Sequence, residues 1–196
     1  MKKLITYTIM ILCVTAIIAV IPTEAEGAIY EDTVRLHILA NSDSDEDQEL
    51  KIKLRDDILT EFATELSAFE SADAAKQSLC NVLPKIEDFS EEKIKEYGYS
   101  YPVAVTLTEE WYDTREYESF TLPCGYYTSL RVIIGDGEGK NWWCVMYPPL
   151  CLDMALEKAP IDDGVKKYSD SEFNLISGNG YKAKFKIMEI ISGIFS

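Results

Sequence analysis

GDGEGKNWWCVMYPPLC, residues 135–151, is the most informative segment of this sequence. Three glycines at alternate positions, which tolerate the positive φ of a turn, come before two adjacent tryptophans, a cysteine and alternating apolar residues. A Pro-Pro pair and a second cysteine end the segment. The pattern predicts a glycine-rich hairpin turn between a strand that ends at Ile134 and a strand over residues 141–147. Since neighbouring residues on a strand point to opposite faces, only one tryptophan can face a one-sided core.

The segments before this hairpin predict further strands and helices. Alternating apolar residues predict strands over residues 33–40 and 101–108, with the first hairpin strand over 127–134 and a short strand within 116–122. Helical spacing predicts a helix from Asp45 to Phe69 and a second over Ser71–Leu83, which Pro84 kinks or restarts, before a last turn that ends at Gly98. The order predicts an α+β fold in one domain, a mainly antiparallel sheet with helices packed on one face, as a two-layer sandwich.

The chain is expected to divide into three regions. Residues 1–27 are expected to form a signal peptide or N-terminal anchor, residues 28–157 the α+β domain, and residues 158–196 a C-terminal tail with a short helix. Near the N-terminus, a pair of lysines precedes an apolar run and small residues around Ala25, which is typical of a secretory signal peptide. The run is nearly long enough to span a bilayer, so an uncleaved anchor remains the alternative. We expect membrane contact only through this N-terminal region, and we expect the tail helix to cover the core.

The overall charge and the absence of several motifs argue against several classes of binding function. A net charge of −15 disfavours nucleic acid as a partner. Metal is not expected, because His37 is the only histidine and no C-x-x-C pair occurs. The acidic run that starts at Asp43 lacks the glycine and the final glutamate of a calcium loop. The glycine run lacks the G-K-[ST] ending of a phosphate loop, so no cofactor is expected.

Two uses compete for Cys144. It lies with Cys151 on either side of the Pro-Pro turn, which makes a disulfide between them a candidate, although spacing alone does not fix the pairing. Alternatively, a Cys144 thiolate with His37 as its base, and Arg131 beside them to bind an oxyanion, would make an extracytoplasmic hydrolase or amidase that acts on cell-wall material.

Strand alternation predicts a mixed face opposite the helices, and such a face suits a protein partner because Trp and Arg dominate interface energetics. The side chains expected there are Arg35, His37, Thr106, Thr108, Ser129, Arg131, Trp142, Cys144 and Met146. The candidate partner-binding residues are Arg35, His37, Arg131, Asn141, Trp142, Pro148 and Pro149.

Four segments, in this order behind the apolar leader, resemble the stage II sporulation protein R family. They are RLHILANSD at 35–43, DQELKIKLRD at 47–56, YPV at 101–103 and LPCGYYTSLRVIIGDGEGKNWWCVMYPPLC at 122–151. The resemblance covers residues 30–153, and Cys124 departs from the LPAGEY that is common in the family.

The resemblance implies a function that composition does not show. Members of the family are made in the forespore and exported into the space between the two engulfment membranes. There they activate a membrane-embedded aspartic protease, which processes a mother-cell sigma-factor precursor, and no catalytic residues are established for them. The expectation is therefore a secreted signalling protein that is not an enzyme. The hydrolase is the alternative, and an anchored structural protein of the envelope is a third interpretation.

Overall fold

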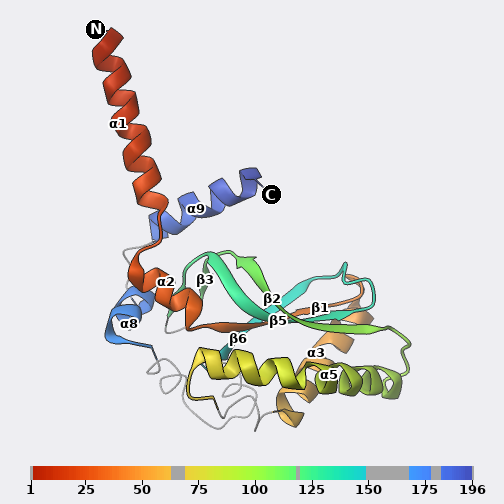
Figure 1. The fold of residues 1–196 in the computed structure, drawn as a ribbon. Coiled ribbons are helices and arrows are strands. Elements are labelled where there is room, and N and C mark those ends of the chain that lie inside the picture. The colour runs from red at the N-terminus through yellow and green to blue at the C-terminus, as the bar shows by residue number, and fades with distance from the viewer. Residues whose placement is uncertain (1, 63–68, 118–119, 149–167, 178–181, 196) are drawn as a thin grey trace.

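The computed structural model describes residues 2–62, 69–117, 120–148, 168–177 and 182–195 (Figure 1). The helices are α1 (Lys2–Val20), α2 (Glu24–Glu31), α3 (Asp45–Glu61), α5 (Ala72–Glu96), α8 (Asp170–Ser177) and α9 (Lys182–Phe195). The strands are β1 (Val34–Leu39), β2 (Val103–Tyr112), β3 (Arg115–Glu116), β4 (Thr121–Leu122), β5 (Gly125–Ile134) and β6 (Asn141–Tyr147). None of the described helices combines the length and the hydropathy that crossing a membrane requires.

The main sheet has the order β2-β5-β1-β6 and is mixed. Strand β5 is antiparallel to β2 but parallel to β1, and β1 is antiparallel to β6. Strands β3 and β4 form a separate small antiparallel pair. The predicted α+β class is confirmed, as a single domain with a mixed sheet.

The predicted hairpin between β5 and β6 is wrong, because β1 lies between the two strands. The glycine-rich loop therefore crosses the end of β1 and bonds to the residues that follow it. Gly139 N–H donates to the Ala40 carbonyl at 2.9 Å, and a Cβ on Gly139 would lie 2.2 Å from the Ser42 carbonyl oxygen. The glycine is needed for this close approach of two backbones.

Helices α3 and α5 cover one face of the sheet, which we call the inner face (Figure 1). Helix α3 begins after the N-cap Ser44, whose hydroxyl accepts the Asp47 N–H, as the acidic start predicts. Helix α5 runs without interruption through Pro84, so a restart of the helix there is wrong. Gly98, with φ 86°, follows its end as predicted. The main core lies between these helices and the sheet and includes Leu36, Leu54, Ile86 and Val132.

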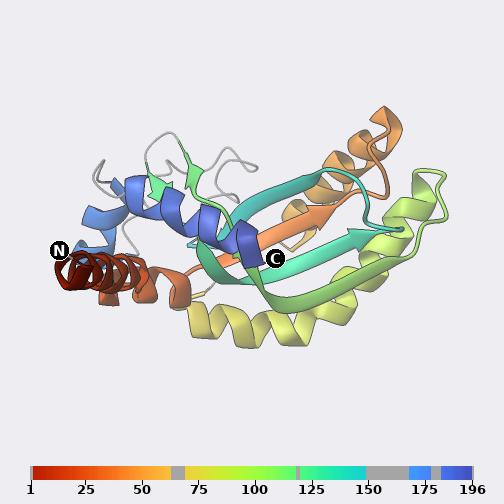
Figure 2. The same ribbon diagram turned by 90° about the horizontal axis from the view of Figure 1, so that it is seen from above.

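The opposite face, which we call the outer face, is covered at one end only. Helices α2, α8 and α9 and the β3–β4 pair lie over that end, while the end near the glycine-rich loop is open (Figure 2). Phe185 of α9 is buried there, so the tail helix covers a core as predicted. Strand β1 is consequently buried at all six positions, where the alternation predicts a half-buried strand.

Helix α2 was not predicted, and it joins the two ends of the chain. Thr23 and Glu26 form a capping box at its start, and Lys184 of α9 donates to the Glu26 carboxylate at 2.6 Å. Ile29 is fully buried in the second core, which lies beneath the cover of the outer face. The predicted boundary between residues 27 and 28 falls within this helix.

Candidate functional site

The outer face carries the candidate site, and strand register decides which side chains share it. Arg131 of β5 pairs with His37 of β1 and with Thr106 of β2. Ser129 pairs in the same way with Arg35 and Thr108. The register therefore confirms that these six side chains share one face.

The predicted orientation of β6 is reversed from Trp142 to Val145, whereas Tyr147, which pairs with Val34, lies in the main core as predicted. Trp142 pairs with Ile38, and Cys144 pairs with Leu36, which places both on the inner face. Met146 also lies in the main core. A β-bulge opposite Val34 and Arg35 interrupts the alternation, and β6 takes its register from β1 rather than from a hairpin turn.

The two tryptophans consequently have different surroundings. Trp142 is covered by α3, where the Arg55 guanidinium lies 4.9 Å from its ring centroid. Trp143 is on the outer face, with the Arg115 guanidinium 4.0 Å above its ring and the His37 ring 5.7 Å away. Trp143, not Trp142, is the indole beside the candidate site.

His37 lies at the centre of a polar cluster, which we call the His37 cluster and which also contains Glu110, Arg131 and Asn141. Its Nδ1 lies 3.0 Å from the Glu110 carboxylate, and its Nε2 lies 2.7 Å from Asn141 Oδ1. The ring bonds both groups when each nitrogen carries a proton. Arg131 Nε lies 3.3 Å from the other Glu110 oxygen. One carboxylate thus connects β2 to both β1 and β5.

The electrostatics of Glu110 follow from this arrangement. Burial opposes its ionisation, but hydrogen bonds from His37 and Ser129 and the charges of His37 and Arg131 outweigh that effect. The pKa of the Glu110 carboxyl therefore lies below its usual value. The cluster holds an ionised carboxylate between two basic side chains, an arrangement that fixes strands and side chains in place.

Arg35 is not a surface residue, which corrects its prediction as a contact. It is fully buried, with its guanidinium 3.9 Å from the centroid of the Tyr112 ring and 5.2 Å from that of Tyr127. Its Nη2 donates to the Tyr117 hydroxyl at 3.2 Å. Burial raises the pKa of Tyr112, so its hydroxyl stays neutral beside the cation. Arg35 therefore stabilises the covered end of the outer face by stacking and presents no surface to a partner.

The structure brings together three of the predicted contact residues, namely His37, Arg131 and Asn141. Asn141 is exposed, the Arg131 side chain is 36% exposed, and His37 is buried. Pro148 is buried and so is not the exposed turn residue that we expected. Pro149 and Cys151 lie outside the described residues.

The hydrolase alternative is contradicted at its nucleophile. Cys144 is disulfide-bonded, and its side chain is on the face opposite His37. Its pairing with Cys151 stays a prediction. The described free cysteines are Cys13, Cys80 and Cys124. Cys124 is buried, and burial raises its thiol pKa to about 11, so it carries no thiolate at neutral pH.

Sequence reasoning missed Glu110 and Tyr112, because the strand was expected to end at Thr108. Strand β2 continues to Tyr112, and both missed residues stay on the alternation that begins at Thr106. The sequence carries only a weak signal for this extension, because the alternation of polar and apolar residues breaks at Glu109 and Glu110; the strand-favouring pair Trp111 and Tyr112 follows the break.

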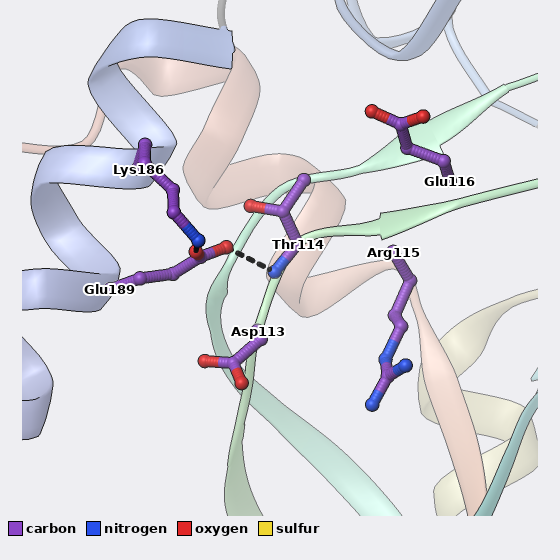
Figure 3. A pocket seen from close by; sticks show the side chains of 6 residues that line it. All are labelled: Asp113, Thr114, Arg115, Glu116, Lys186 and Glu189. Atoms are coloured by element: carbon purple, nitrogen blue, oxygen red, sulfur yellow. Dashed lines mark hydrogen bonds and ion pairs between the residues drawn. The ribbon is translucent and has the colours of Figure 1, made fainter.

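A hollow of about 510 Å³ lies between the end of β2 and α9 (Figure 3). Its lining residues are Asp113, Thr114, Arg115, Glu116, Lys186 and Glu189. Glu189 accepts the Thr114 N–H at 2.9 Å and pairs with Lys186 at 2.8 Å, and Figure 3 shows these groups turned toward one another. Burial opposes the ionisation of Glu189, but these bonds hold the pKa of its carboxyl below the usual value. The carboxylate thus fastens α9 to the sheet.

Metal-binding geometry is absent from the described residues, where no three His, Cys, Asp or Glu side chains converge. The fold and the site together define a small α+β domain in which polar side chains bond to one another across a sheet face that is open at one end.

Comparison with known proteins gives the family. A family model described as stage II sporulation protein R matches residues 30–156. The chain is also 32% identical over 185 residues to the stage II sporulation protein R of Bacillus subtilis (strain 168), an alignment that covers 85% of this chain and 83% of that protein. No solved structure matches. The chain therefore belongs to the stage II sporulation protein R family, and its role is in sporulation.

Proposed function

We propose that this protein is a secreted signal that passes between the two compartments of a sporulating cell. It acts in the space between the forespore and mother-cell membranes. There it activates a membrane-embedded aspartic protease, which processes a mother-cell sigma-factor precursor. The single observation that carries the proposal is family membership, over residues 30–156 and at 32% identity to a sporulation protein.

Two structural observations support a secreted signal over the hydrolase alternative. Cys144 and His37 do not meet, which removes the pair of residues on which the hydrolase alternative depended. The N-terminal helix α1 also leaves a row of large apolar side chains exposed, as an export or anchoring segment would; among them are Leu4, Ile5, Ile9, Met10 and Leu12.

The open end of the outer face is the proposed receptor contact, with Arg131 at its centre. Glu110 orients the guanidinium, and the exposed Thr106 and Asn141 lie on the two flanking sides. A ligand activates a receptor only by binding its active form more tightly. We propose that Arg131 makes a contact that distinguishes the active form of the protease.

A complementation experiment tests the function. The full-length protein is produced in the forespore of a strain that lacks its own stage II sporulation protein R, and conversion of the sigma-factor precursor is followed by immunoblot. Restored conversion is expected, and its absence in cells that contain the exported, folded protein would refute the proposal.

The matched pair for this experiment is Arg131→Ala and Arg55→Ala. Both remove an arginine, but Arg55 lies on the inner side, over Trp142. Arg131→Ala is expected to abolish conversion and Arg55→Ala to preserve it, at similar levels of exported protein. Equal conversion by both variants would exclude Arg131 as the contact.

A further inference from the structure

The free edge of β2 has hydrogen-bonding groups that the fold does not use. The sheet order gives β2 a neighbour on one side only, and Figure 2 shows the strand along the margin of the sheet. The Pro102 carbonyl accepts the Gly135 N–H and so points inward, whereas the Val105 N–H donates to the Glu87 carboxylate at 2.8 Å and points outward. Because backbone direction alternates along a strand, Leu107 and Glu109 also point outward.

These outward groups are open along the middle of the strand. Among the described residues, the N–H and C=O groups of Leu107 and Glu109 have no hydrogen-bond partner. At one end of this stretch the Glu87 carboxylate occupies the Val105 N–H. At the other end the strand continues to Trp111, which points outward in the same alternation. The Val105 N–H is therefore closed to strand addition, while Leu107 and Glu109 keep the donors and acceptors of an unpaired edge.

The charge around this edge indicates what binds there. Glu87 and Glu109 border it, Asp113 follows its end and is accompanied by Lys186, and the whole chain carries a net charge of −15. A second copy of this chain would bring acidic edges together, which disfavours pairing. An extended segment with basic side chains would place cations next to these carboxylates.

We propose that the edge of β2 from Val105 to Trp111 receives an extended, basic segment of the protease receptor as an added β-strand. Backbone hydrogen bonds to Leu107 and Glu109 supply the attachment, and the acidic border supplies the preference for basic side chains. The inference depends on the proposed function for the identity of the partner. The geometry of the open edge is independent of it.

Hydrogen exchange tests the edge directly. The full-length protein is measured alone and with phospholipid vesicles that contain the membrane-embedded aspartic protease of the same organism. Exchange at the Leu107 and Glu109 amides is expected to slow by about tenfold or more when the protease is present. The Thr106 and Thr108 amides are the internal reference, since they already point toward β5.

A pair of variants tests the same edge by function. Glu109→Pro removes one outward N–H, a change that an edge strand tolerates, and Glu109→Ala keeps that N–H while removing the charge. Glu109→Pro is expected to lower sigma-factor processing by about tenfold with an unchanged melting temperature, and Glu109→Ala to lower it by about threefold or less. If Glu109→Pro does not fold, the exchange of the unmodified protein decides alone.

The outcomes separate this inference from the proposed function. Absence of processing with the unmodified protein would refute the function. Processing without slowed exchange at Leu107 and Glu109, or full activity of a folded Glu109→Pro, would refute the edge and leave the function standing. Slowed exchange that depends on protein concentration, with a doubled mass in solution and no protease present, would show a second copy as the occupant and would also refute the inference.

Discussion

The outer sheet face carries a buried arginine at one end and a partly exposed arginine at the other. At the covered end Arg35 is fully buried between aromatic rings, and its guanidinium donates to Tyr117. At the open end the Arg131 side chain is 36% exposed and pairs with Glu110. Both residues lie on the same face of adjacent strands. Residue type and register therefore identify a face, whereas the segments packed upon it decide which arginine holds the fold and which is available for binding.

The largest expected effect is that of Arg35→Ala. Removing a buried side chain that stacks on Tyr112 is expected to lower the free energy of unfolding by about 3 kcal/mol. Urea unfolding of the full-length protein measures the change. Arg131→Ala is the control and is expected to change stability by about 0.5 kcal/mol or less, because its ion pair is partly exposed. Equal losses of stability in the two variants would show that the covered and open ends do not differ in how much their arginines stabilise the fold.

A medium effect is expected for Glu110→Gln, which removes the charge at the open end. The free energy of unfolding is expected to fall by about 1.5 kcal/mol at neutral pH, since the carboxylate bonds to His37 and Arg131. The folded-state pKa of Glu110 is lowered, so its contribution is present above its unfolded-state pKa and is lost as pH falls through the folded value. The stability difference between the unmodified protein and the variant should therefore shrink below about pH 4.5.

Urea midpoints over a pH series give this measurement. The covered end supplies the control, because Arg35→Ala removes a stacking contact with a neutral tyrosine. Its stability difference should stay nearly constant over the same pH range. A Glu110→Gln difference that persists at acid pH would show that the carboxylate does not act through its charge.

The smallest effect on stability is expected for Glu189→Gln, which weakens the contact between α9 and the residues that follow β2. The free energy of unfolding of the variant is expected to be about 0.5 kcal/mol lower, because the amide still accepts the Thr114 N–H but no longer pairs with Lys186. Hydrogen exchange at Thr114 should quicken by roughly twofold to threefold while exchange at Leu130 is unchanged. Faster exchange at both positions would show that α9 supports the whole sheet rather than its covered end.

Much of the fold follows from local patterns in the sequence. The alternation of β1, β2 and β5 predicted their positions and their inner faces, and Ser44 and Gly98 marked helix ends. These features depend on a few neighbouring residues, so the sequence displays them directly. The fold class followed from the order of the elements.

Strand order and the site were harder to predict. A glycine-rich turn between two strands favours a hairpin, and nothing local shows that β1 lies between β5 and β6. Because of this error the sheet faces of Trp142 and Trp143 were exchanged in the prediction, since a shift of one residue in strand register moves each side chain to the other face. The burial of Arg35 depends on cover from distant segments, including α2, whose sequence is typical of a processing region.

The central place of β1 has a consequence for the order in which the protein is completed. Synthesis begins at the N-terminus, yet β1 pairs only with β5 and β6, which follow it by about a hundred residues. Until residue 147 has emerged, this strand, which is buried throughout in the finished fold, lacks one of its two neighbours, and such long-range pairing forms slowly. The main sheet therefore stays incomplete until most of the described chain has been made, because its central strand is the first of its strands to be synthesised.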